Sequence, residues 1–347
     1  MSIVLTRTQN IRPSSNLDKY EIRGSRFGAL DFVLRDAANA GGIATEDLKN
    51  KYFSSIGSTV ETPVIDYDGG ISIGSSRSTT ISDSENTSAM QTISSTVYSW
   101  GFTMVPQLYN NNEIGYQKDF EKKFWKYAWL FLTTLDSACV TLLDTYKNQV
   151  HTNVLPIYTE ASDVVIAALA NELRLLGDVG PMMEANDYFG QLHLVGNTGF
   201  QSIISRLQQQ GTFNNENKQL QYLDKILHYT NRISNAGGHG STFFAVNEGS
   251  TAIMTRVDRE ALNRTKSKAN GREWDVMTFP ILDLPVGTQY YESDGDFNAI
   301  AGAASADMTA AHKEHFGFSV DVALFANYNS DIATRANPIA KYAVATS

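Results

Sequence analysis

The feature that most constrains the fold is a run of apolar residues at helical spacing between Tyr116 and Gln149. Apolar side chains recur every three or four positions, which places them on one face of an α-helix. They are Phe120, Phe124, Tyr127, Phe131, Leu135, Ala138, Leu142 and Tyr146. At about 1.5 Å per residue, roughly 32 residues make a helix of about 48 Å, about three times the mean globular length. Neither proline nor glycine interrupts the run, so the sequence predicts one continuous helix that spans a whole domain.

Residues 57–100 have a different composition, rich in serine and threonine with single isoleucine and valine residues between them. Alternation of Thr, Val and Ile favours strands over helix. Gly69-Gly70 and residues 82–86 have turn-like sequences. We therefore expect a long two-stranded hairpin that projects from the body and needs a surface to lie on, because an isolated hairpin is marginal in water. The alternative is a disordered, low-complexity linker.

The first 27 residues are polar and basic with few apolar anchors, which predicts an extended arm. A short helix is expected over 29–40, ended by Gly41 and Gly42.

The rest of the chain mixes short helices and strands. Helices are expected from the cap residue Ser162 to Leu176 with a stop at Gly177, around Ile203 to Leu207, around Leu220, Leu223 and Leu227, and over Thr251–Asn263. Strands are expected over Tyr188–Val195, Thr242–Val246, Asp275–Leu282 and Phe316–Leu324. Because helices and strands interleave without regular βαβ spacing, the sequence predicts the α+β class.

The charge balance limits the partners. The formal net charge is −9, whereas a protein that grips nucleic acid through its phosphates needs concentrated Lys and Arg. Tight DNA or RNA binding is therefore not expected. Cys139 is the only cysteine, which excludes an internal disulfide and indicates a buried, reduced thiol. We expect no signal peptide, and no membrane partner because Asp136 and Ser137 interrupt the most apolar helix.

Two glycine-rich motifs offer weak signals for chemistry. Residues 196–199 join a strand to a helix, where phosphates often bind, but the longer glycine pattern of a phosphate loop is absent. A simple helix cap by Asn197 or Thr198 is favoured. Residues 237–241 contain His239 beside glycine and serine, but they do not match a nucleophile elbow. A flexible surface loop is favoured there.

Acidic and histidine residues near the end of the chain give two further weak signals. His312 and His315, with Glu314 between them, could share a helical face and bind a metal, but no third ligand is indicated. Glu292, Asp294 and residue 296 faintly resemble a calcium loop without its closing Glu, so a solvated turn is favoured. The sequence therefore assigns no catalytic, cofactor-binding or metal-binding residue and no cofactor.

The order of these parts resembles that of the major capsid proteins of tailed bacteriophages, whose fold is shared with herpesvirus shells. Short stretches at 170–176, 194–199, 255–262, 315–319 and 328–331 also resemble capsid proteins of phage genomes. The resemblance implies an N-terminal arm with a short helix at 1–55 and an extended hairpin loop at 56–110. A peripheral domain with the spine helix would occupy 111–160 and return at 311–347, and an axial domain would occupy 161–310.

This resemblance implies a structural subunit, not an enzyme, that self-assembles into the icosahedral shell around a double-stranded DNA genome. The implied partners are copies of the chain in hexamers and pentamers, a portal, possible decoration proteins and packaged DNA in non-specific contact. A separate scaffolding protein is expected because no long helical segment precedes the arm. Assembly would take place in the host bacterial cytoplasm, with the protein ending in the virion. The alternatives are another virion component, such as a tail or sheath subunit, and an enzyme of unknown type.

The extended loop also bears on how such a shell is held together. Some relatives form an isopeptide bond from a Lys on this loop to an Asn of a neighbour. Between Thr59 and Gln117 the chain has no Lys, and Arg77 is its single basic residue there. Because a guanidinium stays protonated and is a poor nucleophile, we expect a shell without covalent crosslinks.

Overall fold

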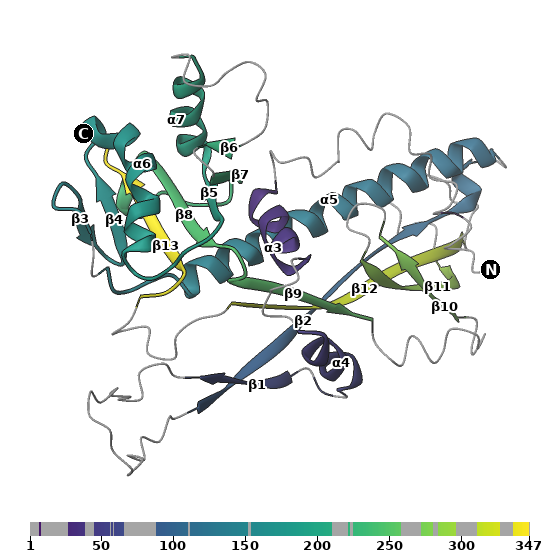
Figure 1. The fold of residues 1–347 in the computed structure, drawn as a ribbon. Coiled ribbons are helices and arrows are strands. Elements are labelled where there is room, and N and C mark those ends of the chain that lie inside the picture. The colour runs from purple at the N-terminus through teal and green to yellow at the C-terminus, as the bar shows by residue number, and fades with distance from the viewer. Residues whose placement is uncertain are drawn as a thin grey trace, which may run out of the picture. The chain divides into compact units, whose positions relative to one another are not determined.

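A computed structural model describes residues 7, 27–38, 45–55, 57, 59–65, 88–109, 112–151, 154–209, 221–222, 225–257, 272–279, 284–295, 311–326 and 336–346. Its helices and strands form two compact units (Figure 1). Unit 1 takes its described residues from 1–21, 95–134 and 255–323, and unit 2 from 22–94, 135–254 and 324–347. Both units combine helices with sheet, which confirms the predicted α+β class.

The predicted long helix is confirmed as α5, which is continuous over Glu113–Thr145. Its residues up to Thr134 belong to unit 1. The side chain of Asn112 opens the helix by accepting a hydrogen bond of 3.0 Å from the Gly115 amide. Leu135 is fully buried and Leu130 is exposed, so the amphipathic stripe in the sequence identifies the buried face.

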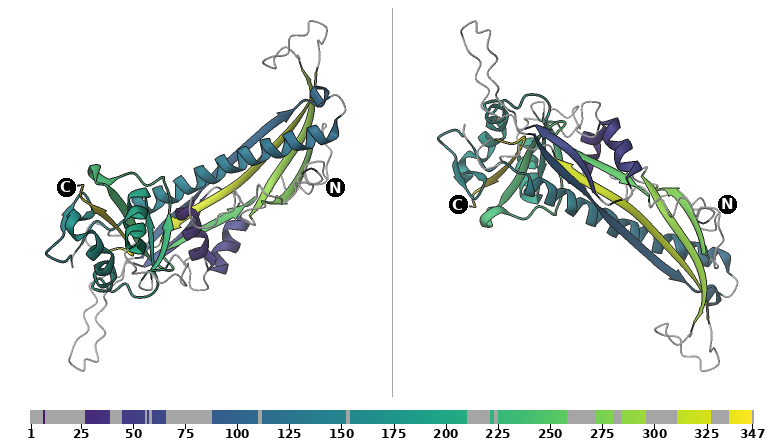
Figure 2. Two further views of the ribbon diagram at one scale, coloured as in Figure 1. Left: turned by 90° about the horizontal axis from the view of Figure 1, so that it is seen from above. Right: turned by 90° about the horizontal axis from the view of Figure 1, so that it is seen from below.

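Unit 1 also contains an antiparallel sheet in the order β2-β12-β11-β10. Its strands are β2 (Ser88–Met104), β12 (Ala311–Ala326), β11 (Pro285–Gly295) and β10 (Arg272–Thr278). The expected strand over Phe316–Leu324 lies within β12 and is confirmed. In both views of Figure 2 the unit-1 part of α5 lies alongside β2 and β12.

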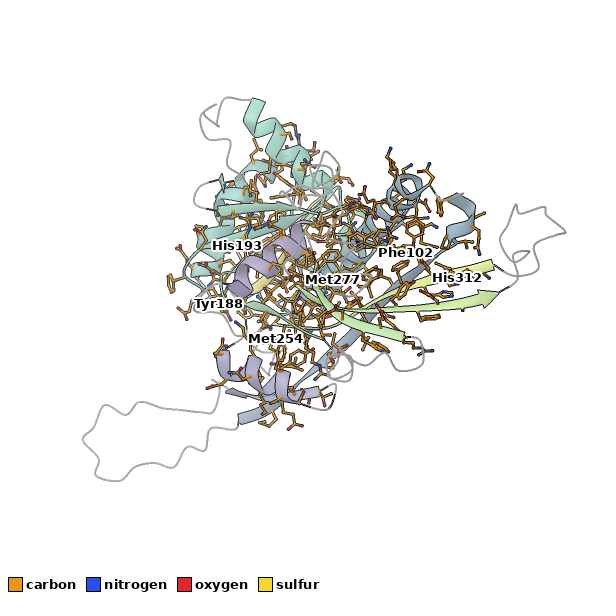
Figure 3. The ribbon with its side chains drawn as sticks, turned by 90° about the vertical axis from the view of Figure 1, so that its right-hand side faces the viewer. Phe102, Tyr188, His193, Met254, Met277 and His312 are labelled. Carbon is orange, nitrogen blue, oxygen red and sulfur yellow. The ribbon has the colours of Figure 1, made fainter. Side chains whose placement is uncertain are left out.

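Aromatic side chains join α5 to this sheet. The ring of Trp100 stacks on Phe131 at 4.6 Å between centroids and on Phe318 at 5.7 Å. Phe120 meets Phe316 edge-on at 5.0 Å, and Phe102 lies within the same cluster (Figure 3). Such pairs each add about 0.5–1.5 kcal/mol beyond the area they bury, so the helix is fixed against the sheet by its rings.

Unit 2 is built on a seven-stranded mixed sheet in the order β3-β4-β13-β8-β5-β7-β6. The strands are β3 (Thr159–Ala161), β4 (Val164–Ala167), β13 (Ile339–Val344), β8 (Ser241–Asn247), β5 (Leu192–Gly196), β7 (Lys225–Tyr229) and β6 (Gln221–Tyr222). The β4–β13 and β5–β7 pairs are parallel and the others antiparallel. Helices α6 (Glu172–Glu184) and α7 (Thr198–Gln209) supply buried side chains to one core with these strands.

The first part of β2 belongs to unit 2, where it pairs with β1 (Thr59–Ile65) in an antiparallel ladder over Ser88–Ser94. This ladder confirms the two strands of the predicted hairpin, while its expected turn residues between 66 and 87 lie outside the described part. Two helices precede it, α3 (Gly28–Ala38), as expected, and α4 (Glu46–Ser54), capped by Thr45. Lys51 of α4 donates a hydrogen bond of 2.8 Å to the carbonyl of Glu61 in β1.

The helix expected around Leu220, Leu223 and Leu227 is wrong for the residues described. Lys225–Tyr229 form strand β7, which lies between β5 and β6 and buries Leu227. Leu220 and Leu223 lie outside the described residues. The leucine spacing matched a helix, but pairing with two neighbouring strands decided the conformation, since tertiary context overrides local propensity.

Two other helix predictions need correction. Thr251–Arg256 form strand β9, and residues 258–263 of the expected helix lie outside the described part. Ser162 does not cap a helix, because it has φ 53° in the turn between β3 and β4. Helix α6 begins only at Glu172, and it continues through Gly177.

Strand boundaries also differ from expectation. β5 begins at Leu192, not at Tyr188, and β10 begins at Arg272, not at Asp275, and ends at Thr278. Residues 280–282 of the expected strand lie outside the described residues. The expected strand at Thr242–Val246 and the helix around Ile203 are confirmed by β8 and α7. No described helix is long and apolar enough to span a membrane.

Candidate functional site

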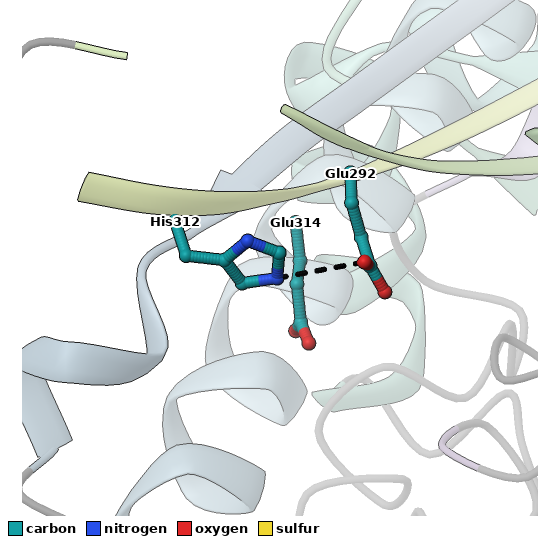
Figure 4. Close-up of side chains that lie close together, drawn as sticks. All are labelled: Glu292, His312 and Glu314. Carbon is teal, nitrogen blue, oxygen red and sulfur yellow. Dashed lines mark ion pairs between the residues drawn. The ribbon is translucent and has the colours of Figure 1, made fainter. Parts of the chain in front are cut away.

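Glu292, His312 and Glu314 form the one group in the described part of the chain with three side chains placed to share a metal ion. Their ligand atoms all lie within 4.8 Å of one another. His312 Nε2 lies 3.6 Å from Glu292 Oε2, the ion pair drawn in Figure 4. All three belong to unit 1.

The antiparallel ladder explains why they meet. Glu292 of β11 lies directly opposite Glu314 of β12, and Asp294 lies opposite His312. Residues two apart on a strand point to the same side of a sheet, so His312 and Glu314 share one face with Glu292. The group lies near the end of the ladder, where β11 finishes and β12 begins.

Two tyrosine hydroxyls hold the carboxylates. Tyr290 donates a hydrogen bond of 2.6 Å to Glu292 Oε1, and Tyr116 of α5 donates one to Glu314 Oε2. Burial, and next the hydrogen bond to a carboxylate, raises the pKa of both tyrosines. Both hydroxyls therefore stay protonated at neutral pH and keep donating. The guanidinium of Arg7 lies over the Tyr116 ring, 4.6 Å from its centroid, within cation–π distance.

His315 does not join His312, so the shared helical face that the sequence offered as a weak possibility does not form. The segment is a strand and not a helix, and residues three apart on a strand point to opposite sides. His315 instead hydrogen-bonds Thr103 Oγ1 at 2.9 Å and Ser293 Oγ at 2.7 Å. The third candidate ligand, which the sequence pattern did not indicate, is Glu292 on the neighbouring strand β11. Residue 296 of the calcium-loop pattern lies outside the described residues.

The glycine-containing turn at 196–199 forms a helix cap, as favoured from the sequence. Asn197 Oδ1 accepts hydrogen bonds from the amides of Phe200 and Thr242 at 3.0 and 3.2 Å. A Cβ on Gly199 would lie 2.1 Å from the Gly240 carbonyl oxygen, so only glycine fits. The amides of Asn197, Phe200 and Gln201 already donate to protein oxygens, which is the arrangement of a helix cap. In the second glycine motif, Gly237 and Gly238 have φ of 53° and 82°, a left-handed backbone conformation that glycine adopts without steric strain.

Unit 2 contains a buried histidine pair that sequence reasoning missed. His193 Nδ1 lies 3.0 Å from His228 Nε2, and His228 Nδ1 lies 3.1 Å from Asp31 Oδ2 (Figure 3 labels His193). His193 Nε2 is buried and has no hydrogen-bond partner among the described residues. Burial first, and then the neighbouring His228, lowers the pKa of His193 to about 4. The three residues come from α3, β5 and β7, so only the folded sheet reveals the chain of contacts.

A cavity of about 330 Å³ in unit 2 is lined by the end of α5 and by Arg232, Phe244 and Lys341. Each charged side chain that lines it has an ion-pair partner. Lys341 donates to Asp144 Oδ1 at 2.7 Å, and Lys147 contacts the same oxygen at 3.3 Å. Arg232 contacts Asp136 at 3.0 Å. Internal pairing of this kind is structural and does not select a ligand.

Large apolar side chains are exposed on both units: Val97, Leu108, Ile114 and Leu130 on unit 1, and Phe53, Met90, Ile157, Leu169, Leu173 and Phe189 on unit 2. Phe189 is 66% exposed and Ile114 is 69% exposed. Single exposed apolar residues are normal.

No model of a known protein family and no curated protein matches the chain. Among solved structures, "Mycobacterium phage Adephagia" and "Mycobacterium phage Cain" are similar at TM-score 0.47, with 10% and 12% identity, and in both cases the match covers 100% of this chain and 99% of the other. The "Asymmetric unit of bacteriophage PhiM1 mature capsid" is similar at TM-score 0.46 and 9% identity, over 84% of this chain and 83% of the other. Because these TM-scores lie below 0.5, the likeness carries no conclusion about function.

Proposed function

We propose that the chain is the major capsid protein of a tailed bacteriophage, a structural subunit that assembles into the icosahedral shell around double-stranded DNA. The ladder of β1 and β2 supports this most. Val60 and Ile93 pair across it and are buried, whereas Glu61, Met90 and Thr92 on its other face are exposed. A two-stranded ladder with one open face gains stability when a second chain lies on it.

The four-part division of the sequence carries over as part of this proposal. The arm and first helices occupy 1–55 and the hairpin 56–110. The peripheral part occupies 111–160 with 311–347, and the axial part 161–310. β10 and β11 fall within 161–310 by number, but they pair with β12. We therefore place these two strands with the peripheral part.

The proposed partners follow from the same role. Copies of the chain would form hexamers and pentamers, guided by a separate scaffolding protein and closed at one vertex by a portal, with decoration proteins as optional additions. The net charge of −9 favours a lining that contacts packaged DNA only non-specifically. We propose assembly in the host bacterial cytoplasm, and no enzymatic role.

Electron microscopy of the full-length protein, expressed alone and with its scaffolding protein, tests the proposal. Closed shells are expected. Tubes would favour a tail or sheath subunit instead, and monomers that persist at high concentration would contradict both. Met90→Asp, on the open face of the ladder, should reduce shell yield without unfolding the subunit. Asn50→Asp adds the same charge on the exposed residue Asn50 of α4 and serves as the matched control.

Detergent electrophoresis tests how such shells hold together. Because the expected loop has no Lys between Thr59 and Gln117, boiled mature particles should release one band near 38.3 kDa. A ladder of multimers that survives reducing agent would show that a covalent bond forms elsewhere.

A further inference from the structure

We propose that Glu292, His312 and Glu314 bind one divalent cation of the first transition row, with Zn²⁺ as the best fit. This site is a property of the single subunit and does not depend on the function proposed above.

The electrostatics of the ladder favour a cation at this place. Glu292 and Glu314 face each other directly in register, and like charges directly opposite on a sheet destabilise it. The imidazole of His312 lies 3.6 Å from Glu292 Oε2 and can offset at most one unit of this negative charge. A dication between the three groups would offset the repulsion and use the histidine nitrogen as a ligand.

The distances suit a small ion. Around a tetrahedral Zn²⁺, bonds of about 2.0–2.2 Å to nitrogen and oxygen place two ligand atoms roughly 3.3–3.6 Å apart. His312 Nε2 and Glu292 Oε2 are already 3.6 Å apart, and all the ligand atoms lie within 4.8 Å of one another, so rotation of the side chains is enough to close the site. Glu292 and His312 have side chains 49% and 38% exposed, which leaves them room to make that adjustment.

The donor set determines the kind of cation. One imidazole and two carboxylates suit Zn²⁺ and its first-row neighbours, whereas Ca²⁺ and Mg²⁺ prefer all-oxygen sites. Tyr116 and Tyr290 each hold one oxygen of a ligating carboxylate, as outer-shell partners do in metal sites. Three protein ligands leave a coordination position for water or for a side chain of a second copy.

Calorimetric titration of the full-length protein tests the site, after chelator treatment and with ZnCl₂ as the probe. We expect saturable binding of one ion per chain. His312→Gln and Glu314→Gln should each weaken it by at least about tenfold, the usual effect of disturbing a metal site. His239→Gln, on a loop of unit 2, is the matched control and should leave the affinity unchanged. Circular dichroism of each variant shows whether its fold is retained.

X-ray absorption at the zinc edge gives a second measurement that folding effects do not imitate. The expected spectrum has only nitrogen and oxygen neighbours with an imidazole contribution, which His312→Gln removes. No saturable binding below millimolar Zn²⁺, or equal affinity in the wild type and both variants, would overturn the proposal. Neither result depends on whether shells form.

Discussion

The two units hold their distant segments together in different ways. In unit 1 the first part of α5 meets the sheet through stacked and edge-on aromatic rings, among them Trp100, Phe131 and Phe318. In unit 2 an apolar core is combined with carboxylates that have no exposed surface. Asp136 accepts hydrogen bonds from the Leu30 amide at 2.9 Å and the Thr230 hydroxyl at 2.6 Å.

Asp36 repeats this arrangement in the same unit. Its Oδ2 accepts hydrogen bonds from the amide and the hydroxyl of Thr251 at 2.7 and 2.8 Å, and its other oxygen accepts one from Gly249. Ring contacts are numerous and only weakly directional, so the loss of one lowers the free energy of unfolding by a modest amount. A buried carboxylate is directional, and removing it leaves several donors unsatisfied at once. We therefore expect abrupt losses in unit 2 and graded losses in unit 1.

The largest effect is expected at Asp136. Asp136→Ala removes a buried charge that is paired with Arg232 and leaves its donors without an acceptor, which should cost about 3–5 kcal/mol of unfolding free energy. Burial raises the pKa of Asp136, so the neutral form is comparatively well tolerated and Asp136→Asn should cost clearly less. Urea denaturation of the unassembled subunit measures both. Equal losses in the two variants would show that the charge itself is what matters.

In unit 1, Phe318→Ala should cost about 3–5 kcal/mol, the range for a buried Phe. Phe318 is 3% exposed and contacts the rings of Trp100, Phe102 and Phe124. Phe318→Leu keeps much of the apolar volume and should recover a large part of the loss, as a graded interface requires. Urea denaturation measures both variants. If Phe318→Leu loses as much unfolding free energy as Phe318→Ala, the aromatic cluster tolerates substitution no better than the buried carboxylates of unit 2.

A third test compares two leucines on the one helix that both units share. Leu135 is 0% exposed and Leu130 is 58% exposed. Leu135→Ala should cost about 2–5 kcal/mol, and Leu130→Ala under about 0.5 kcal/mol. Similar losses at the two positions would mean that the buried face of α5 has been assigned wrongly.

The smallest effect is the pH dependence expected from His193. Its pKa of about 4 in the folded chain lies below the ordinary value of 6.5, so the unfolded chain binds the proton more tightly between these values. Stability is therefore complete above pH 6.5 and falls by about 1–3 kcal/mol as the pH drops towards 4. His228 and Arg35 oppose protonation and Asp31 favours it. His193→Asn should therefore reduce the pH dependence of the melting temperature over this window. If the pH dependence is the same in the variant and the wild type, other groups cause the loss of stability at low pH.

The elements that the sequence predicted well are those whose own pattern decides the structure. The α5 helix has a single unbroken stripe of 3.6-residue period, and β12 alternates Phe316, Phe318, Val320 and Val322 with smaller or polar residues. β7 and β9 were missed because their local sequences fit a helix equally well. Their strand form depends on neighbours far along the chain, which no local pattern specifies.

The candidate metal site shows the same limit. The sequence drew attention to His312 and to Glu292 separately, and neither motif was sufficient alone. Only the register of β11 against β12 places Glu292 opposite Glu314. The buried pair His193 and His228 gave no sequence signal, because each lies in an ordinary apolar strand and the two meet through parallel pairing of β5 and β7.

The pairing of β2 with β12 has a consequence for synthesis on the ribosome. Phe102 pairs with Phe316, so β2 leaves the exit tunnel long before its partner exists. At about 5–20 residues per second, the delay is roughly 10–40 s. An unpaired strand edge attracts other chains during such a wait. Within this ladder β2 has several serines and threonines, among them Ser95, Thr96 and Ser99, which give the waiting edge polar side chains that water can solvate.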